Sequence, residues 1–467
     1  MGNPIITQVR KFLHIHQSEF VRDLGRLVAI QSVSTDGRHQ KEITQSARLT
    51  CQLMRRAGLG DVKMLQIGKS NPYAFGQWLG APGKPTVFLY AHHDVQPVTA
   101  AGWKSPPFKL TARAGRLFGR GACDDKGAIV AELAAIAALL KTTGSLPVNV
   151  KMVVEGEEEI GSPNLEAFFT KFRKLIHSDV VVVCDTGNLA AGIPSLTYSL
   201  RGHVSALLEV ASAQHAVHSG ICGGFMPDPA LALCVILARL FPGEGKNPLP
   251  EQLGALLAVT PEERAAIAGL PGEAQTWRKD FGLLDDVRFA NDPELHPYEQ
   301  IWRQPAVTVQ ALQASSIQGR SNQILPAAAA AIGYRTVPNQ DGQQVIEQLR
   351  ELLTANPPWN VRVKFTPTGQ TAWWTTDPHG PAFAAARRAL QAGYGKEPTS
   401  IGCGGTIGFI RPLCELFGGA PALLLGIEDP RSNAHAANES LHHGDLIKLM
   451  ASIAFLFHEL TRTTTKP

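Results

Sequence analysis

Imidazole and carboxylate side chains stand at five points of this 467-residue chain, each near the end of an apolar run or a glycine-rich turn. Each one alone has an ordinary explanation: a surface loop, a helix cap, a solvated run of charge, a turn or a structural histidine. Together, two imidazoles and three carboxylates are the ligands expected for two divalent ions that share one carboxylate. Such a pair of ions polarises a carbonyl group and generates hydroxide at neutral pH. The residues are His92, Asp124, Glu159, Asp185 and His435.

The segment AHHDVQP (91–97) places a histidine and an aspartate two residues apart. In a strand, alternate side chains point to the same face, so His92 and Asp94 project together while His93 points away. A carboxylate in that position suits an orienting partner for a metal-binding imidazole.

Two further segments are rich in acidic residues. In GRGACDDKG (119–127), the acid at position 124 breaks the phosphate-binding pattern G-x-G-x-x-G and favours a cation, with Asp124 or Asp125 as the ligand. In EGEEEIGS (155–162), the crowded like charges are unfavourable unless they are solvated or neutralised by a cation. Adjacent acids there can have different roles: one carboxylate binds metal, and its neighbour deprotonates the water.

These residues need a scaffold that brings them together. Apolar strands alternate with helical segments in the first 200 residues, which predicts an α/β fold with a mostly parallel sheet and helices on both faces. Ligands of such sheets bind beyond the carboxyl ends of the strands, where the candidate residues stand. The predicted strands are 86–95, 148–159 and 179–185, and the predicted helices are 5–31, 42–58 and 127–143.

Residues 201–367 follow a different order. Four strands and two helices alternate as β-α-β-β-α-β, the ferredoxin-like arrangement, with a polar insert over about 241–303. From about residue 368 the first pattern resumes, with helices over 381–393 and 444–461 and a strand over 421–427. The chain is therefore predicted to contain a catalytic domain, 1–200 and 368–467, interrupted by an inserted domain, 201–367.

Composition excludes several classes of protein. The hydrophobic content of 44% and charged content of 18% exclude a disordered chain. The net charge of +4 is too small for a nucleic-acid binder recognised by its charge. No apolar run reaches the ~18 residues of a membrane helix, and no apolar segment of a signal peptide is present. Seven cysteines without a CxxC pair suit a reducing compartment, so a cytoplasmic protein without nucleic-acid or membrane partners is expected.

The chain resembles the aminoacylase/carnosinase-type di-metal peptidases, a family of cytosolic dipeptidases, carboxypeptidases and amino-acid deacylases. The matching motifs occur in family order along essentially the whole chain, and the inserted segment corresponds to the family's lid. The motifs are AHHDVQP (91–97), Trp103 with PPF (106–108), RLFGRGACDDKG (116–127), EGEEEIGS (155–162), HSG (218–220), YRTVP (334–338), GCGGTIG (402–408) and SNAHAANES (432–440).

The resemblance implies a role for each metal ligand. Asp124 would bridge two ions, His92 and Asp185 would complete one site, and Glu159 and His435 would complete the other. The two ions per subunit are expected to be zinc, with manganese or cobalt as alternatives, because the mixed imidazole and carboxylate set suits all three.

The resemblance also assigns residues that act beside the metals. Asp94 would orient His92, and Glu158 would be the general base that activates the bridging water. His218 of the HSG motif would reach the active site of a partner subunit and stabilise the oxyanion. A homodimer formed through the lid domain is therefore expected.

Two motifs are expected to receive the carboxylate of the substrate, because a guanidinium fork and backbone N–H groups suit that task. Since YRTVP and GCGGTIG fall in different predicted domains, this pocket is expected to close when the lid does. The residues are Arg335, Gly404, Gly405 and Thr406.

Two departures from the family leave alternatives open. Many relatives have Met after the bridging aspartate where this chain has Asp125, so either Asp124 or Asp125 is the bridging ligand. Carnosinase-like members often have Arg-Glu where Gly402-Cys403 stands here, which removes a charge near the pocket and leaves the substrate open.

The predicted function is hydrolysis of an amide bond in a dipeptide or short peptide that has a free carboxylate. An N-acyl amino-acid deacylase with the same site is the alternative. A non-catalytic binding protein on this fold is disfavoured, because all five ligands and Glu158 are present.

Overall fold

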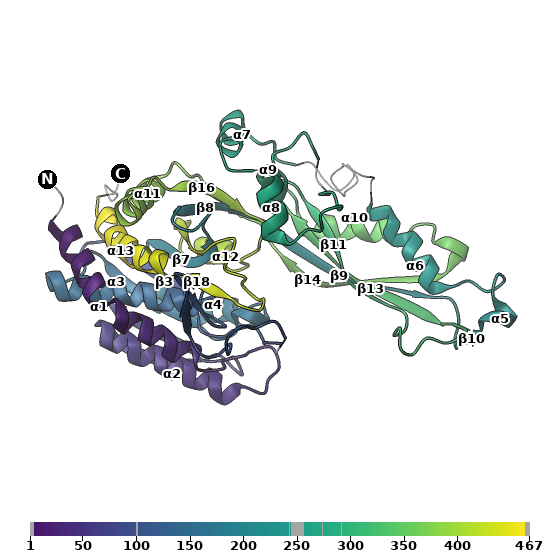
Figure 1. The fold of residues 1–467 in the computed structure, drawn as a ribbon, viewed down its shortest axis with the longest axis horizontal. Helices are drawn as coiled ribbons and strands as arrows, with labels where there is room; N and C mark the ends of the chain where they lie inside the picture. The colour runs from purple at the N-terminus through teal and green to yellow at the C-terminus, as the bar shows by residue number, and fades with distance from the viewer. Residues whose placement is uncertain are drawn as a thin grey trace. The chain divides into compact units, whose positions relative to one another are not determined.

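The computed structural model describes most of the chain, and the described residues form two compact units, shown in Figure 1. Unit 1 consists of Met1–Tyr198, Thr376–Ile401 and Phe409–Pro467, and unit 2 consists of Ser199–Thr375 and Gly402–Gly408. The described residues are 4–99, 101–241, 243, 256–272, 274–290 and 292–462.

A mixed sheet, with nine strands among the described residues, is the centre of unit 1. Its middle strands β6, β3, β7 and β17 are parallel, whereas the strands on either side of them are antiparallel. The predicted α/β class is confirmed, but the mostly parallel sheet is corrected to a mixed one. The antiparallel strands lack the long apolar runs that mark parallel strands buried on both faces, so their sequence signal is weaker. In spatial order the strands are β1 (Gly60–Leu65), β2 (Tyr73–Trp78), β6 (Asn149–Glu155), β3 (Thr86–His92), β7 (Val180–Gly187), β17 (Ala422–Glu428), β8 (Ser195–Leu200) and β15 (Trp374–Thr375), with β16 (Thr399–Cys403) paired to β8.

Helices pack against this sheet in two groups. Five of them contact one another in a single layer, and α4 contacts α12 in a second layer. Helix α3 is apolar on almost every side and buried, so it packs both on the sheet and under its neighbouring helices. It ends at Gly144, which adopts the left-handed conformation that commonly terminates helices. The first layer contains α1 (Pro4–Val28), α2 (Gln40–Ala57), α3 (Lys126–Thr143), α11 (Pro381–Tyr394) and α13 (His443–Leu460), and the second contains α4 (Leu165–Ile176) and α12 (Ile410–Leu416).

The parallel strands bring the candidate residues to one edge of the sheet. His92 is the last residue of β3 and pairs in register with the last residue of β6, while Asp185 lies near the end of β7. A small antiparallel sheet connects the loop that precedes Asp124 with the loop that contains His435. Its strands are β4 (Thr111–Arg113), β5 (Arg116–Phe118) and β18 (Ser440–His442).

Unit 2 has the predicted β-α-β-β-α-β order. Its antiparallel sheet packs one face on two helices, and a short two-stranded ribbon with one small helix lies at one end (Figure 1). The sheet order is β11 (Ala306–Gln313), β13 (Ala327–Thr336), β9 (Gly202–Ala211) and β14 (Arg362–Thr371); the helices are α6 (Pro229–Leu237) and α10 (Gly342–Thr354); and the ribbon and its helix are β10 (Val217–His218), β12 (Gln323–Ile324) and α5 (Ser219–Cys222).

The predicted polar insert, 241–303, lies only partly within the described residues. Its described part contains three short helices, and the last of them packs against the first. They are α7 (Pro261–Ala268), α8 (Ala274–Phe281) and α9 (Pro297–Arg303).

The prediction that YRTVP and GCGGTIG lie in different domains is wrong. Gly402–Gly408 belongs to unit 2, although the sequence placed it in the catalytic domain. The segment is held there by contacts between residues that are far apart in the chain. For example, the backbone N–H of Arg201 donates a hydrogen bond to the carbonyl of Cys403, at 3.3 Å. No local pattern encodes such a contact. Among the described residues, no helix is long and apolar enough to cross a membrane.

Candidate metal centre

Two clusters of side chains in unit 1 have the composition and spacing of metal sites. In each cluster, one ligand atom from every member lies within 4.8 Å of the others. Asp124 belongs to both clusters, so the structure brings all five sequence-predicted ligands together around one shared carboxylate. The first cluster is His92, Asp124 and Asp185, and the second is Asp124, Glu159 and His435.

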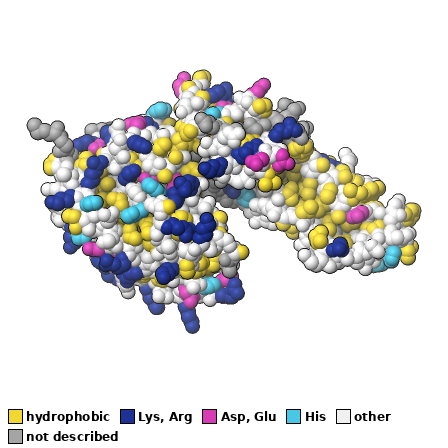
Figure 2. Space-filling view, viewed as in Figure 1, with side chains coloured by type: hydrophobic (Ala, Val, Ile, Leu, Met, Phe, Trp, Pro, Cys, Tyr) yellow, Lys and Arg dark blue, Asp and Glu magenta, His cyan; other side chains and the backbone are white. Residues whose placement is uncertain are grey.

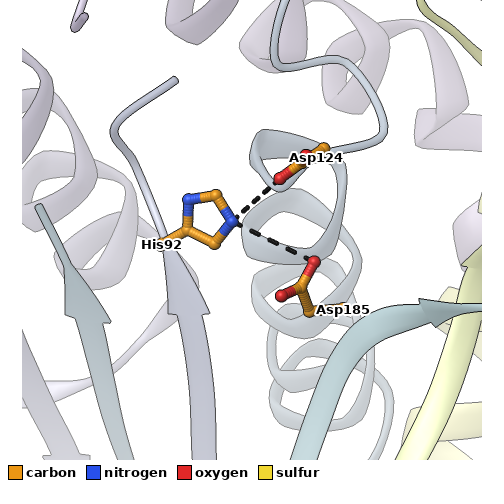
Figure 3. Close-up of side chains that lie close together, drawn as sticks. All are labelled: His92, Asp124 and Asp185. Atoms are coloured by element: carbon orange, nitrogen blue, oxygen red, sulfur yellow. Dashed lines mark ion pairs between the residues drawn. The ribbon is translucent and has the colours of Figure 1, made fainter. Parts of the chain in front are cut away.

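The first cluster, drawn in Figure 3, joins the ends of β3 and β7 to the loop before α3. Nε2 of His92 lies 2.9 Å from Oδ1 of Asp124 and 4.0 Å from Oδ1 of Asp185. This nitrogen is fully buried and has no hydrogen bond of acceptable geometry to a described residue. A cation between the three side chains would satisfy that nitrogen and both carboxylates, as in a metal site.

The second cluster faces the other side of the shared carboxylate. Nε2 of His435 lies 2.8 Å from Oδ2 of Asp124 and 3.2 Å from Oε2 of Glu159. His435 has a φ of 62°, a left-handed conformation that is uncommon outside glycine and clusters at functional sites. Asp125, the alternative bridging residue, lies in neither cluster and instead accepts the backbone N–H of His92 at 3.2 Å.

Asp94 is fully buried behind the first cluster. Its Oδ1 lies 3.5 Å from Nδ1 of His92, on the ring edge opposite the cluster. Its two oxygens also accept the backbone N–H groups of Glu158, at 3.2 Å, and Glu159, at 3.1 Å. The carboxylate of Asp94 therefore fixes both the imidazole ring of His92 and the turn that carries Glu158 and Glu159.

The adjacent acids have different surroundings. Glu159 belongs to the second cluster and accepts hydrogen bonds from the backbone N–H of Gln96, at 3.1 Å, and from its side-chain amide, at 2.8 Å. Glu158 belongs to neither cluster, and burial raises the pKa of its carboxyl to about 7. A carboxyl group with a pKa near neutrality is suited to accept and return a proton.

Glu439 fixes the loop that ends at Asp124. Its buried carboxylate accepts the backbone N–H groups of Gly121, at 2.9 Å, and Cys123, at 3.1 Å. It also accepts the N–H of Asp124, at 3.3 Å, and pairs with the guanidinium of Arg120, at 2.6 Å. The backbone position of the shared ligand thus depends on one carboxylate from a distant part of the chain.

The two clusters carry more negative than positive charge. Hydrogen bonds to Asp124 and Glu159 raise the pKa of His435 to about 11, and nearby carboxylates raise the pKa of His92 even though burial lowers it. Burial raises the pKa of both Glu159 and Asp185. A divalent cation in each cluster would supply the missing positive charge, and the mixed nitrogen and oxygen donors suit zinc, manganese or cobalt. The residues therefore fit two divalent ions.

Unit 2 contains the predicted carboxylate-binding residues side by side. Nη1 of Arg335 donates to the hydroxyl of Thr406 at 2.7 Å, and that hydroxyl donates to the backbone carbonyl of Arg201 at 2.6 Å. The hydroxyl therefore has no hydrogen left for a carboxylate. The N–H of Gly405 points to Sγ of Cys403, at 3.3 Å, and the carbonyl of Gly404 accepts a further bond from the side chain of Arg201.

His218 lies elsewhere in unit 2, on β10, and its side chain is exposed. Its Nδ1 accepts the backbone N–H of Gly220 at 3.0 Å. A nitrogen that accepts this bond carries no proton, so the proton of the neutral ring is on Nε2. The side chain thus presents an N–H donor to its surroundings.

Comparison with known proteins identifies the family. The sequence profile of Peptidase family M20/M25/M40 matches residues 88–459, a span that includes both clusters. The chain belongs to this family. The predicted resemblance and the predicted hydrolase class are thereby confirmed.

Several relatives of this M20 protein have known structures or activities. The Cysteinylglycine-S-conjugate dipeptidase of Corynebacterium striatum is 33% identical over 360 residues, which cover 76% of this chain and 77% of that protein. The crystal structure of human carnosine dipeptidase 1 matches with a TM-score of 0.84 and 26% identity, covering 98% of this chain and 99% of the other. The M20 family metallo-carboxypeptidase Sso-CP2 from Sulfolobus solfataricus matches with a TM-score of 0.82 and 26% identity, covering 95% and 99%.

Sequence reasoning does not single out two residues that position the M20 centre, Gln96 and Glu439. Both stand inside motifs that carry the family resemblance, AHHDVQP and SNAHAANES, and that position is their only signal in the sequence. Their partners are 63 and 315 residues away, so local spacing gives no sign of the contacts.

Replacing Glu439 by glutamine should weaken the loop that ends at Asp124. The amide keeps the size of the side chain, but it leaves the buried Arg120 without its counter-charge, and breaking a buried pair in this way costs about 3–5 kcal/mol. The melting temperature of metal-free protein should fall, and calorimetric titration should show weaker binding of divalent metal. The control is Glu347→Gln, which breaks a pair with Arg350 on the exposed side of α10. Equal melting temperatures for the two variants would contradict the role of Glu439.

Proposed function

We propose that this chain is a metal-dependent dipeptidase, which hydrolyses the amide bond of a dipeptide or short peptide with a free carboxylate. The observation that carries the proposal is the pair of clusters that share Asp124, together with Glu158, which belongs to neither cluster but interacts electrostatically with His92 and Asp124. The names of the relatives, two dipeptidases and a carboxypeptidase of the same family, support a substrate of this class.

His92 and Asp185 would hold one ion, Glu159 and His435 would hold the other, and Asp124 would bridge them. Two bound divalent ions polarise a carbonyl group and lower the pKa of water. We expect zinc, with manganese and cobalt as alternatives that the same donors accept.

Glu158 is the general base of this proposal, since it lies beside the ligands without being one. It takes a proton from the attacking water and returns it to the nitrogen of the leaving amine. The hydroxyl bonds to the carbonyl carbon and the C–N bond breaks, so one water is consumed and a carboxyl group and an amine are released. Asp94 keeps the turn of Glu158 in place through the backbone N–H bond described above.

Unit 2 supplies the groups that bind the substrate and its oxyanion. Arg335 donates one N–H to Thr406, and its remaining N–H groups suit the carboxylate of the substrate. The turn of Gly404 and Gly405 lies beside Arg335. The Nε2–H of His218 suits the oxyanion that develops during hydrolysis.

A homodimer through unit 2 is the proposed assembly. Hydrophobic side chains gather on the surface of unit 2 in Figure 2. On α6, Leu231 is 54% exposed, and Val235 is exposed too; on the edge strand β11, Leu312 is 58% exposed beside Val309. An unpaired edge strand next to an apolar helix face is suited to pair with a second copy through a two-fold contact.

The cytoplasm is the proposed compartment. All seven cysteines are free, and such thiols persist where the environment is reducing. Small peptides are the proposed partners besides the second subunit; the net charge of +4 gives no basis for a nucleic-acid partner.

Metal removal tests the function directly. Prolonged dialysis against a chelator should abolish hydrolysis of a dipeptide panel, and zinc, manganese or cobalt should restore it, because the ions provide the polarising charge. The panel should include N-acetyl amino acids, which separate a dipeptidase from a deacylase. Full activity of metal-free protein, or hydrolysis of the N-acetyl compounds alone, would overturn the proposal.

The adjacent glutamates should respond differently to the same substitution. Glu158→Gln should keep both metals but lose about 100- to 10,000-fold in turnover, because only the base is removed. Glu159→Gln should lower metal affinity, because a ligand is removed. Metal content by atomic emission and turnover at saturating metal distinguish the two. Reversed behaviour of the variants would show that their roles are exchanged.

Catalysis should need two subunits if His218 acts across the dimer. His218→Ala should lower turnover about 100- to 1,000-fold with unchanged metal content, the effect of losing an oxyanion donor. Mixing His218→Ala with Glu158→Gln subunits should regenerate activity, because a heterodimer contains one site with both residues intact. If activity does not recover after verified subunit exchange, or if a monomer is fully active, His218 does not act in the active site of the partner subunit.

A further inference from the structure

Two guanidinium groups and one imidazole lie together at one end of the sheet in unit 2. His203 on β9 stands directly opposite Arg335 on β13, so both side chains lie on the same face of the sheet. Arg201 immediately precedes β9, and burial, together with the charge of Arg335, lowers the pKa of Arg201 to about 10. Burial and Arg335 also lower the pKa of His203. Like charges so placed destabilise a sheet unless an anion binds between them.

No carboxylate of the described residues compensates this cluster. The other titratable group near both guanidinium groups is the thiol of Cys403. Elsewhere in the described chain, buried arginines have acidic partners: Arg116 pairs with an aspartate at 2.8 Å, and Arg120 with a glutamate at 2.6 Å. Arg201 and Arg335 are half-buried and have no such carboxylate partner among the described residues.

Neutral groups hold the two guanidinium groups in place. Nε of Arg201 donates to the carbonyl of Gly404 at 2.9 Å, and its Nη1 donates to the carbonyl of Gln304 at 3.3 Å. Nη1 of Arg335 is fixed by the hydroxyl of Thr406 at 2.7 Å. These carbonyl and hydroxyl partners fix position without removing charge. Each guanidinium keeps further N–H donors, and one carboxylate would neutralise only one of the two.

We infer that Arg201, His203 and Arg335 bind two carboxylates of one substrate, so that the preferred dipeptides end in aspartate or glutamate. Arg335 takes the terminal carboxylate, as in the proposed function on which this inference rests. Arg201, with His203 beside the pair, takes the side-chain carboxylate. Arg201 and His203 thus determine which residue follows the scissile bond.

Matched substrates test this preference. With saturating zinc, kcat/KM should be roughly 10- to 100-fold higher for Ala-Asp than for the isosteric Ala-Asn, and likewise for Ala-Glu over Ala-Gln, the range expected for one charge-assisted contact. Ala-Ala serves as the common reference substrate.

Variants of Arg201 test whether this residue causes the preference for Ala-Asp over Ala-Asn. Arg201→Gln should remove most of the difference between Ala-Asp and Ala-Asn, and Arg201→Lys, which keeps the charge, should retain part of it. Arg350→Gln, an arginine of the same unit that pairs with Glu347, should leave the ratio as in wild type.

The outcomes separate the two proposals. A kcat/KM for Ala-Asn that equals or exceeds that for Ala-Asp overturns this inference but leaves the proposed dipeptidase function unchanged. Equal losses for both substrates in Arg201→Gln also overturn it, because both arginines would then hold one carboxylate. No hydrolysis of any dipeptide overturns the proposed function itself, and this inference with it.

Discussion

The crowding of carboxylates at the ends of parallel strands is the constraint on which unit 1 depends. Parallel strands end at one edge of the sheet, so acids that are distant in the sequence meet within a few ångströms there. Their repulsion is strong where water is excluded. Burial accordingly raises the pKa of Glu159 and Asp185, and the clusters raise the pKa of His435. The centre needs added positive charge, which its donor atoms are arranged to receive.

The acids that surround the centre differ from those within it. The negative charge of the surrounding acids is balanced by arginine side chains and backbone N–H groups of the protein. Glu439 has the guanidinium of Arg120 and three backbone N–H groups, and Asp429 has Arg116. Asp94 has backbone N–H groups of the next turn. These contacts fix the loops that hold the ligands. The candidate ligands Asp124, Glu159 and Asp185 have no arginine or lysine partner among the described residues, which leaves their oxygens available for a cation.

Unit 2 has the opposite imbalance. Arg201 and Arg335 are held by carbonyl and hydroxyl groups and have no carboxylate partner among the described residues. In an M20 peptidase, an acidic centre and a basic cluster suit different parts of the same peptide. Under the proposed function, the acidic centre would hold ions that polarise an amide, and the guanidinium groups would bind carboxylate. Under the proposed function, the two imbalances correspond to two features of the same substrate class, its amide bond and its carboxylates.

The sequence by itself determined which residues would stand at strand ends, the α/β class and the β-α-β-β-α-β order of the inserted segment. Apolar runs and their endings are local properties, so His92 and Asp185 could be placed from the chain alone. Glu159 and His435 were placed in the same way, and the family motifs added the role of each residue. Only the tertiary structure decided that the sheet is mixed, that Gly402–Gly408 packs with unit 2 and that Glu439 holds the loop of Asp124. It also showed that Arg201 and Arg335 have carbonyl and hydroxyl partners but no carboxylate partner among the described residues. These features rest on hydrogen bonds and charge balance between residues hundreds of positions apart, as between Thr406 and Arg201, and no local periodicity records which distant groups will meet.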